Sequence, residues 1–382
     1  MERRQFLKLS GGGVILAAMA AGGGFLATRE PEAALAPWRR AGKGYDDPRL
    51  EALSWAILAP NPHNRQPWVV RLDGGDGFTL FVDLDRRLPE TDPFDRQITI
   101  GLGCFLEISR QAASHLGYEM EVFPFPDGEP KVRLDERPVA KVRLVKSPVK
   151  PDSLFAQVGA RRSCREPFDL ERRPTMAELT ALKTAVGKDV SFNASLDPEM
   201  VQAITEICWQ GHVVESETKP THMESVNLMR IGKAEIEANP DGISLGGPFL
   251  ETLKLIGMLD REQLADPGSE AYRQGMEMYQ AMFEATPAFV WLGGRGNQRV
   301  DQLNAGRDWV RLNLAATGLG LALHPVSQTL QEYPEMKELY QQVHTLLQAE
   351  GEGRIHMIGR LGYGPTTSPS PRWPLATRVQ TA

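Results

Sequence analysis

Ala59-Pro60-Asn61-Pro62-His63-Asn64-Arg65-Gln66-Pro67-Trp68 is the stretch that decides the fold. Its three prolines exclude a helix, because each lacks an N–H and restricts the residue before it. An apolar helix pattern precedes the stretch over about 48–59, and an apolar strand pattern follows it over 68–72. A stiff loop crowded with polar side chains, between a helix and a strand, is suited to holding a planar polar ligand.

Outward from this loop, helical and strand-like patterns mix without a regular repeat. Helical periodicity covers about 95–117, 175–186, 197–215, 222–238, 269–284 and 299–318. Strand-like runs cover 78–84, 119–124, 140–145, 289–292 and 355–360. This mixture predicts an α+β fold rather than an alternating α/β repeat.

Composition excludes several classes of function. The net charge is −6 with the signs well mixed, and no long basic run marks a nucleic-acid partner. The cysteines are three and far apart, which excludes a fully paired disulfide framework and gives no metal-ligand spacing. The seven histidines form no cluster either, so we expect no metal site.

The N-terminus reads as a targeting segment. Arg3-Arg4-Gln5-Phe6-Leu7-Lys8 matches the twin-arginine export pattern, and 9–28 carries no charge and six glycines. A plain membrane anchor is the alternative, since about 20 residues just span a bilayer. Ala34-Leu35-Ala36 fits a small-x-small cleavage site, but Pro37 directly after it is unfavourable. We expect residues 1–36 to direct export, leaving the protein periplasmic or tethered to the outer face of the cytoplasmic membrane.

A weak internal repeat suggests two related halves. The sequence at 112–117 (Ala-Ala-Ser-His-Leu-Gly) resembles that at 315–320 (Ala-Ala-Thr-Gly-Leu-Gly), and each ends a long amphipathic helix. Chance similarity is the alternative, because these residue pairs are common. A proline-punctuated linker at 147–151 divides the chain into halves at 37–150 and 151–382.

A second polar motif follows that linker. Arg161, Arg162 and Arg165 place three cations within five residues, with a hydroxyl at Ser163. Guanidinium groups suit a phosphate because they donate two parallel hydrogen bonds in one plane. A solvated basic turn is the alternative interpretation.

Together the two motifs resemble those of the nitroreductase family. The loop matches the family's flavin-edge motif at Pro60, Asn64, Gln66, Pro67 and Trp68, with Asn61 in place of the usual serine. The run from Arg161 to Phe168 resembles the phosphate motif, which in ordinary members precedes the loop. The reversed order resembles the Acg subgroup, fused chains whose two halves mimic the family's homodimer. The resemblance therefore implies a nitroreductase-like fold, one FMN per chain and a monomer.

The resemblance also implies which residues meet FMN. Arg161, Arg162 and Ser163 would hold the phosphate, and Arg165 would face the pyrimidine side of the ring. The loop residues Asn64 and Gln66 would reach the flavin or its ribityl chain, although bonding to local backbone is the alternative for such side chains. Further expected contacts come from Pro60 and Asn61 in the loop, from Pro325, Val326 and Ser327 at the flavin N5 edge, and from Arg372 at the phosphate.

Two functions fit this resemblance. The first is an exported FMN oxidoreductase that reduces a small electrophile at flavin N5, with no side-chain nucleophile and with a quinol or a redox partner as electron donor. The second is a protein that sequesters or stores FMN. Residues 215–285, rich in methionine and charge, would form a lid over the flavin and, if closed, would exclude substrates.

Overall fold

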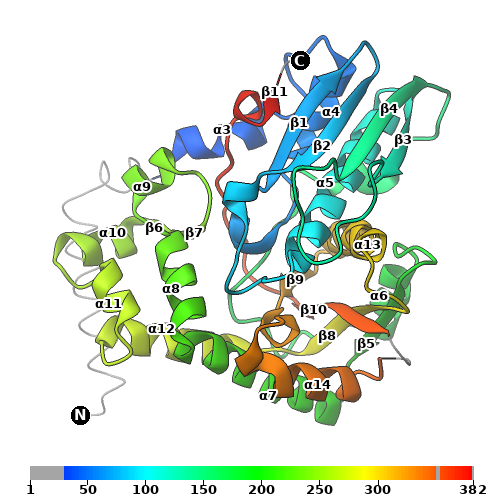
Figure 1. The fold of residues 1–382 in the computed structure, drawn as a ribbon. Coiled ribbons are helices and arrows are strands. Elements are labelled where there is room, and N and C mark those ends of the chain that lie inside the picture. The colour runs from blue at the N-terminus through cyan, green and yellow to red at the C-terminus, as the bar shows by residue number, and fades with distance from the viewer. Residues whose placement is uncertain (1–29, 350–352, 381–382) are drawn as a thin grey trace.

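A computed structural model describes residues 30–349 and 353–380 (Figure 1). The twin-arginine pattern and the uncharged stretch after it lie outside these residues. Within the described part of the chain, no helix combines the length and hydropathy needed to cross a membrane. The structure confirms the α+β class, because its helices accompany two separate sheets whose strands, apart from one short C-terminal strand, run antiparallel.

The described helices lie between residues 32 and 346. In chain order they are α3 (Glu32–Arg40), α4 (Pro48–Ala56), α5 (Arg96–His115), α6 (Met176–Lys183), α7 (Pro198–Glu217), α8 (Lys219–Leu228), α9 (Lys233–Ala238), α10 (Pro248–Leu255), α11 (Arg261–Ala265), α12 (Glu270–Glu284), α13 (Arg299–Gly318) and α14 (Lys337–Leu346).

The strands form two main sheets and a two-stranded ribbon. The first sheet has the order β11-β1-β2-β4-β3, from β11 (Val379–Gln380), β1 (Trp68–Asp73), β2 (Gly77–Val82), β4 (Ala140–Lys146) and β3 (Tyr118–Pro124). The second has the order β5-β8-β10-β9, from β5 (Ser191–Ser195), β8 (Ala288–Gly294), β10 (Arg354–Gly362) and β9 (Ala322–Pro325). The ribbon pairs β6 (Met229–Ile231) with β7 (Ile243–Leu245).

The two sheets repeat one topology. In the first, a helix (α4) precedes two adjacent strands, a long helix (α5) follows them, and the next strand lies at the edge with the last strand beside it. The second repeats this order with α6, β5, β8, α13, β9 and β10, and differs by insertions after β5 and after β9. The short strand β11 then returns to the first sheet and pairs in parallel with β1.

The long helices α5 and α13 pack against each other between the sheets (Figure 1). Both their first residues and their last residues are 203 positions apart in the chain (299 − 96 and 318 − 115). A Cβ added at Gly103 would collide with the Leu303 carbonyl, and one added at Gly306 would collide with the Ile100 carbonyl. These two contacts are related by the same offset, so the helices cross as two copies would across a two-fold axis.

The first residue of each long helix is an arginine that forms hydrogen bonds with the other half of the chain. Arg96 of α5 donates to the carbonyls of Leu330 (2.7 Å) and His356 (3.0 Å), next to the second sheet. Arg299 of α13 donates to the carbonyls of Pro130 (3.3 Å) and Val132 (2.8 Å), which belong to the first unit. Each half is therefore fastened to the other by a buried guanidinium at the start of its central helix.

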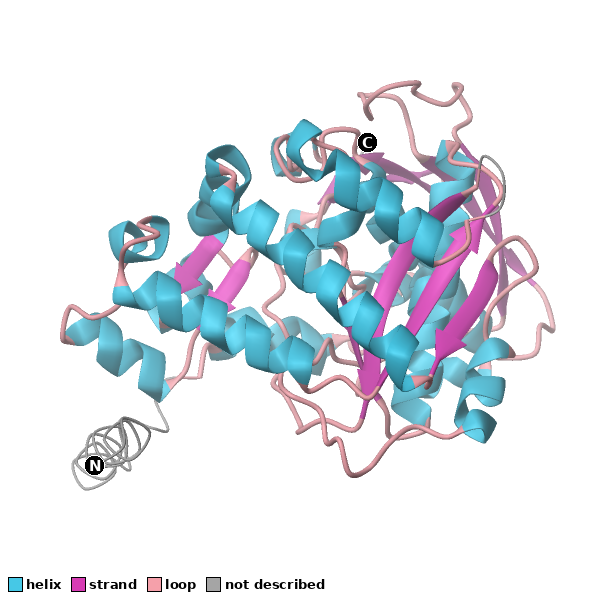
Figure 2. Cartoon of the chain, turned by 90° about the horizontal axis from the view of Figure 1, so that it is seen from below, coloured by secondary structure: helices cyan, strands magenta, loops and turns pink. Residues whose placement is uncertain are grey.

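A second core lies on the other side of the second sheet. Along β8, Val290 and Leu292 face the main core with α13, whereas Phe289 and Trp291 face a cluster built with α7, α12 and α14. Figure 2 shows helices laid across the strands of this sheet. Period-two alternation in an apolar strand thus matches a sheet that is covered on both faces.

The predicted lid region forms a separate lobe beside the two sheets (Figure 1). It contains α8 to α12 and the β6–β7 ribbon. The expectation of one helix over 222–238 was wrong, because β6 interrupts it at Met229–Ile231. Gly232 follows with φ of 82°, a conformation that a helix interior does not contain.

We predict that Gly306→Ala destabilises the protein by at least about 1–3 kcal/mol, because the new methyl group must displace the backbone of α5. The midpoint of chemical denaturation measures this effect. Gly275→Ala in α12 is the matched control, since a Cβ there meets nothing within 4 Å and a helical alanine is preferred over glycine. Equal midpoints for the two variants would contradict the close crossing.

Candidate functional site

The loop at 59–68 lies between α4 and β1 in a strained conformation. Its centre is a short 3-10 turn at Pro62–Asn64. His63, Asn64 and Gln66 have φ of 45°, 51° and 52°, in the left-handed region that non-glycine residues seldom adopt. Each such residue costs of order 1 kcal/mol or more, and such strain concentrates at functional sites.

The polar side chains of the loop hold its shape. Asn61 Oδ1 accepts from the Gln66 N–H at 2.7 Å. Gln66 is fully buried; its Oε1 accepts from the Trp373 N–H (2.9 Å) and its Nε2 donates to the Pro240 carbonyl (2.7 Å). Local and tertiary backbone bonding, the alternative raised by the sequence, therefore occupies these groups, and their contact with a flavin stays a prediction.

Three arginines from distant parts of the sequence gather beside this loop. Arg161 and Arg372 are buried, Arg162 is half-buried, and the guanidinium Cζ atoms of all three lie 4.8–5.9 Å from the centroid of the Trp38 ring. Among the described residues none of the three forms an ion pair with a carboxylate. We call Arg161, Arg162 and Arg372 the arginine cluster.

Burial and mutual repulsion lower the pKa values of the arginine cluster. Burial lowers the pKa of Arg161 to about 10, and it also lowers the pKa of Arg162. For Arg372, burial and then the charges of Arg161 and Arg162 hold the pKa well below its usual value. A bound anion would offset the mutual repulsion and favour the charged form of each arginine, so the charge of the cluster suits an anion.

The hydrogen-bond donors of the cluster divide into occupied and unoccupied groups. Arg372 donates to the carbonyls of Ile57 (2.8 Å), Leu58 (3.1 Å) and Ala59 (3.1 Å), just after the end of α4, and its Nη1 donates to Asn64 Oδ1 (2.6 Å). These carbonyls carry the negative end of the α4 dipole and offset part of the charge.

Arg161 and Arg162 keep free donors. Arg161 donates through Nη2 to Leu58, but its Nε is buried and has no partner among the described residues. Arg162 Nη1 donates to the carbonyls of Gly159 and Arg161, and its Nε is likewise without a partner. Arg161 and Arg162 can therefore donate to a phosphate, while Arg372 contributes charge and fixes the loop.

The two other residues of the second motif that were expected to contact FMN lie toward the solvent. Ser163 and Arg165 are exposed. The charge of Arg165 helps to lower the pKa of His63, after burial and Arg65, to about 4, and it also lowers the pKa of His324, after burial and Arg360. Both histidines are therefore neutral at pH 7, and neither was identified from the sequence as part of the site.

The segment expected at the flavin N5 edge follows β9. Pro325 ends that strand, and the Val326 N–H donates to the Ile358 carbonyl at 2.9 Å, so this donor is occupied. The Ser327 N–H has no partner within the described residues, while its Oγ donates to Gln97 Oε1 at 3.3 Å. Of the three expected residues, Ser327 has the backbone donor available.

Ion pairs of Asp241, which we call the Asp241 latch, hold the lid lobe against the first half. Asp241 is buried and pairs with Arg230 (2.8 Å) of the lobe and with Arg65 (3.4 Å) and Arg86 of the first half. Burial alone would raise the pKa of Asp241, but the Arg230 hydrogen bond and the arginine charges hold it below its usual value. The Gly242 N–H also donates to the Asn64 carbonyl at 3.3 Å.

The sequence did not reveal the Asp241 latch or the position of Trp38. Both depend on contacts between distant segments, although Pro37-Trp38-Arg39-Arg40 is an aromatic-basic run that would have been a signal.

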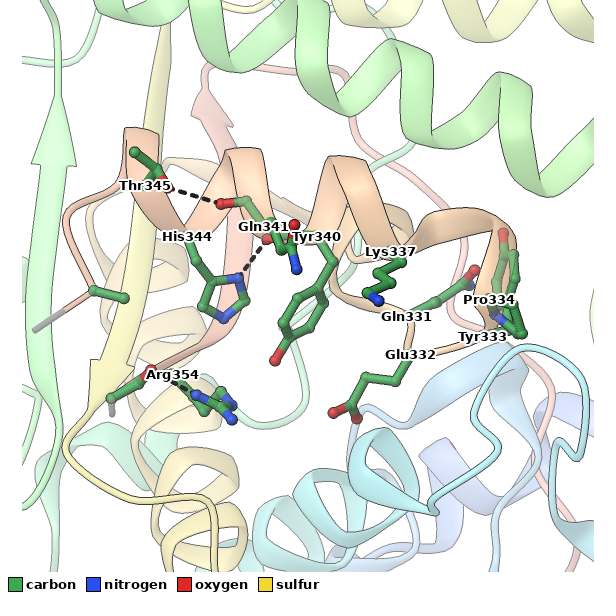
Figure 3. Close-up of a pocket in the computed structure, with 12 residues that line it drawn as sticks. Gln331, Glu332, Tyr333, Pro334, Lys337, Tyr340, Gln341, His344, Thr345 and Arg354 are labelled. Carbon is green, nitrogen blue, oxygen red and sulfur yellow. Dashed lines mark hydrogen bonds between the residues drawn. The ribbon is translucent and has the colours of Figure 1, made fainter. Parts of the chain in front are cut away.

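A cavity of about 760 Å³ lies away from the loop and the arginine cluster. Figure 3 shows its lining, which runs from Gln331 through α14 to Arg354 of β10 and includes Glu332, Tyr340 and His344. The His344 Nε2 accepts from the Ile355 N–H, and Glu332 pairs with Arg96 at 3.3 Å. These polar groups support the fold, so the cavity is not the candidate site.

Comparison with known proteins links the chain to nitroreductase relatives. No family model matches it. A protein of Mycobacterium tuberculosis H37Rv, provisionally named an NAD(P)H nitroreductase, is 26% identical over 344 residues, covering 86% of this chain and 90% of the relative. An uncharacterized protein of the same organism is 30% identical over 144 residues, covering 37% of this chain and 41% of that protein.

Solved structures of nitroreductases are also similar, at a low level. The FMN-bound nitroreductase of Bacteroides fragilis matches with a TM-score of 0.34 and 16% identity over 57% of this chain and 91% of its own. The FMN-dependent nitroreductase of Mycobacterium smegmatis in complex with NADPH gives a TM-score of 0.36 and 15% identity over 59% and 96%. At such TM-scores these matches give no basis for placing a ligand in this chain.

Buried histidines predict loss of stability in mild acid. Burial is the leading cause that lowers the pKa of six histidines: to about 4 for His63, His212 and His344, to about 3 for His356, well below its usual value for His324, and below its usual value for His222. Below pH 6.5 the unfolded chain binds these protons and the folded chain does not, so stability falls as the pH falls toward 4.

Three buried carboxyls oppose this trend. Burial raises the pKa of Asp92 to about 6 and of Glu215 to about 7, and it also raises the pKa of Asp95, so the folded state binds their protons first. Six histidines against three carboxyls leave a net loss, at about 1.4 kcal/mol per pH unit for each uncompensated group. Urea denaturation at pH 7 and pH 5 should show lower stability at pH 5. Equal or higher stability at pH 5 would contradict the claim that these histidines are buried and neutral in the folded state.

Proposed function

We propose that this chain binds one FMN and acts as an oxidoreductase of the nitroreductase type on a small electrophile. The observation that carries the proposal is the arginine cluster, which holds three cations beside a strained loop with no carboxylate partner among the described residues. The relative named as an NAD(P)H nitroreductase supports it, since the similarity extends over most of both chains.

FMN fits the donors that the site offers. Arg161 and Arg162 would hold its phosphate through their free N–H groups, and the charge of Arg372 would add to theirs. Arg165 would face the pyrimidine side of the ring, and the Ser327 N–H would face the N5 edge. When bound, FMN supplies hydride or electron transfer, so the protein itself has to bind, orient and cover the ring.

The repeated topology supports a monomer with one site. The loop comes from the first half and the arginine pair from the second, as in a dimer whose subunits share a site. The reciprocal α5–α13 crossing resembles a subunit interface enclosed within one chain. The Acg-like tandem arrangement, with halves at 37–150 and 151–382, accounts for both features.

The Asp241 latch favours the second candidate function, FMN sequestration. Asp241 of the lid lobe pairs with Arg65 of the loop and with Arg86 of the first half, and the backbone of Pro240 and Gly242 adds two hydrogen bonds to the loop. A lid held in this way would shield the ring from substrates. Export by a twin-arginine leader belongs to the proposal in either case, whereas electron supply by NAD(P)H, a quinol or a redox partner belongs to the oxidoreductase function alone.

Reoxidation kinetics distinguish the two functions. The purified protein would be loaded with FMN, photoreduced without oxygen, and mixed with a nitroaromatic compound and separately with a quinone. Oxidoreductase function predicts reoxidation within seconds, whereas sequestration predicts a reduced flavin that persists for many minutes. A protein that takes up no FMN at all would rule out both functions.

The phosphate assignment predicts the effect of Arg162→Ala. Losing charge-assisted hydrogen bonds should weaken FMN binding about 10- to 100-fold, while the half-buried position limits damage to the fold. Fluorescence titration of FMN measures the affinity. Arg40→Ala on α3 is the control, since Arg40 is exposed and its side chain has no described partner. Equal FMN affinity in the two variants would contradict the assignment.

A further inference from the structure

The helix α3 lies against the arginine cluster. Ala34, Leu35 and Pro37 are buried, and α3 packs on both α4 and α9. The Arg372 N–H donates to the Ala34 carbonyl at 2.8 Å, and Trp38 Nε1 donates to the Ser370 carbonyl at 2.8 Å. The helix therefore holds the C-terminal segment that carries Arg372 at two points.

The Trp38 ring faces all three guanidiniums of the cluster. Its centroid lies 4.8 Å from the Cζ of Arg162, 5.4 Å from that of Arg372 and 5.9 Å from that of Arg161. An aromatic face attracts a guanidinium through the quadrupole of the ring. It accepts none of the in-plane N–H hydrogen bonds, so it stabilises the cations without occupying their donors or cancelling their charge.

A carboxylate in this place would do the opposite. It would pair with the N–H groups and neutralise the cluster, leaving less for an incoming anion. We propose that Trp38 is a positioning residue of the phosphate site, which keeps Arg161 and Arg162 together and available to a phosphomonoester, and that α3 is a permanent part of the FMN-loaded protein. The proposal rests on the FMN function proposed above.

Affinities for FMN and for riboflavin, which lacks the phosphate, test the role of Trp38. In the full chain, Trp38→Leu should bind FMN roughly tenfold more weakly than wild type and leave riboflavin affinity unchanged. Trp38→Phe should retain most of the FMN affinity. Both variants lose the indole N–H, so the difference between them isolates the aromatic face. Arg39→Ala, on the exposed side of the same helix, is the control.

The outcomes separate this proposal from the function on which it rests. Equal losses for FMN and riboflavin in Trp38→Leu, or equal FMN affinities in the Leu and Phe variants, would overturn the role of Trp38. A wild-type protein that binds no FMN would instead overturn the proposed function. Thermal unfolding of each variant identifies any that fails to fold. If Trp38→Leu fails to fold, Trp38→Phe is compared with wild type, and a tenfold or greater loss of FMN affinity would contradict the role of the aromatic face.

The retention of α3 has its own readout. Cleavage after Ala36 would remove the first half of the helix, including the carbonyl that accepts from Arg372. The intact mass of the exported, FMN-loaded protein should therefore include Glu32 to Ala36. A product that begins at Pro37 and still binds FMN as tightly as the uncleaved chain would overturn this part of the proposal.

Discussion

The close crossing of α5 and α13 is the constraint on which the rest of the structure depends. Two glycines allow the helix backbones to touch, and the reciprocal contacts leave no room for a side chain at either position. The crossing fixes how the two sheets face each other, and Arg96 and Arg299 then fasten each half to the other. Because the halves are held in this way, a loop from one and an arginine pair from the other can form a single site.

The site concentrates positive charge without neutralising it by acids. The carbonyls after α4 and the face of Trp38 stabilise the arginine cluster, and neither removes its net charge. In contrast, the neighbouring arginines Arg65, Arg86 and Arg230 are paired with Asp241. Two adjacent groups of three arginines therefore differ in whether they have a carboxylate partner. One group shares the Asp241 carboxylate and holds the lid lobe, and the other has no carboxylate partner among the described residues, which suits a phosphate ligand.

Much of this architecture could be predicted from the sequence because it depends on local patterns. The periodicity over 299–318 gave the bounds of α13, and the prolines at 60, 62 and 67 marked the turn between α4 and β1. Short or atypical elements were missed: β5 and β9 carry little alternation, and Gly232 breaks a pattern that otherwise reads as one helix. Side-chain roles were harder still. Gln66 looked available for a ligand, but its amide bonds to backbone groups some 170 and 300 residues away, which no local pattern encodes.

The central claim is that the arginine cluster receives the phosphate of FMN. The most direct measurement is a crystal structure of the full chain grown with FMN, in which the position of the phosphate is located. The account predicts the phosphate within hydrogen-bond distance of Arg161 and Arg162, with Trp38 beside it and the ring between the 59–68 loop and Ser327. A phosphate bound elsewhere, for example in the cavity lined by Lys337 and Arg354, would contradict the account.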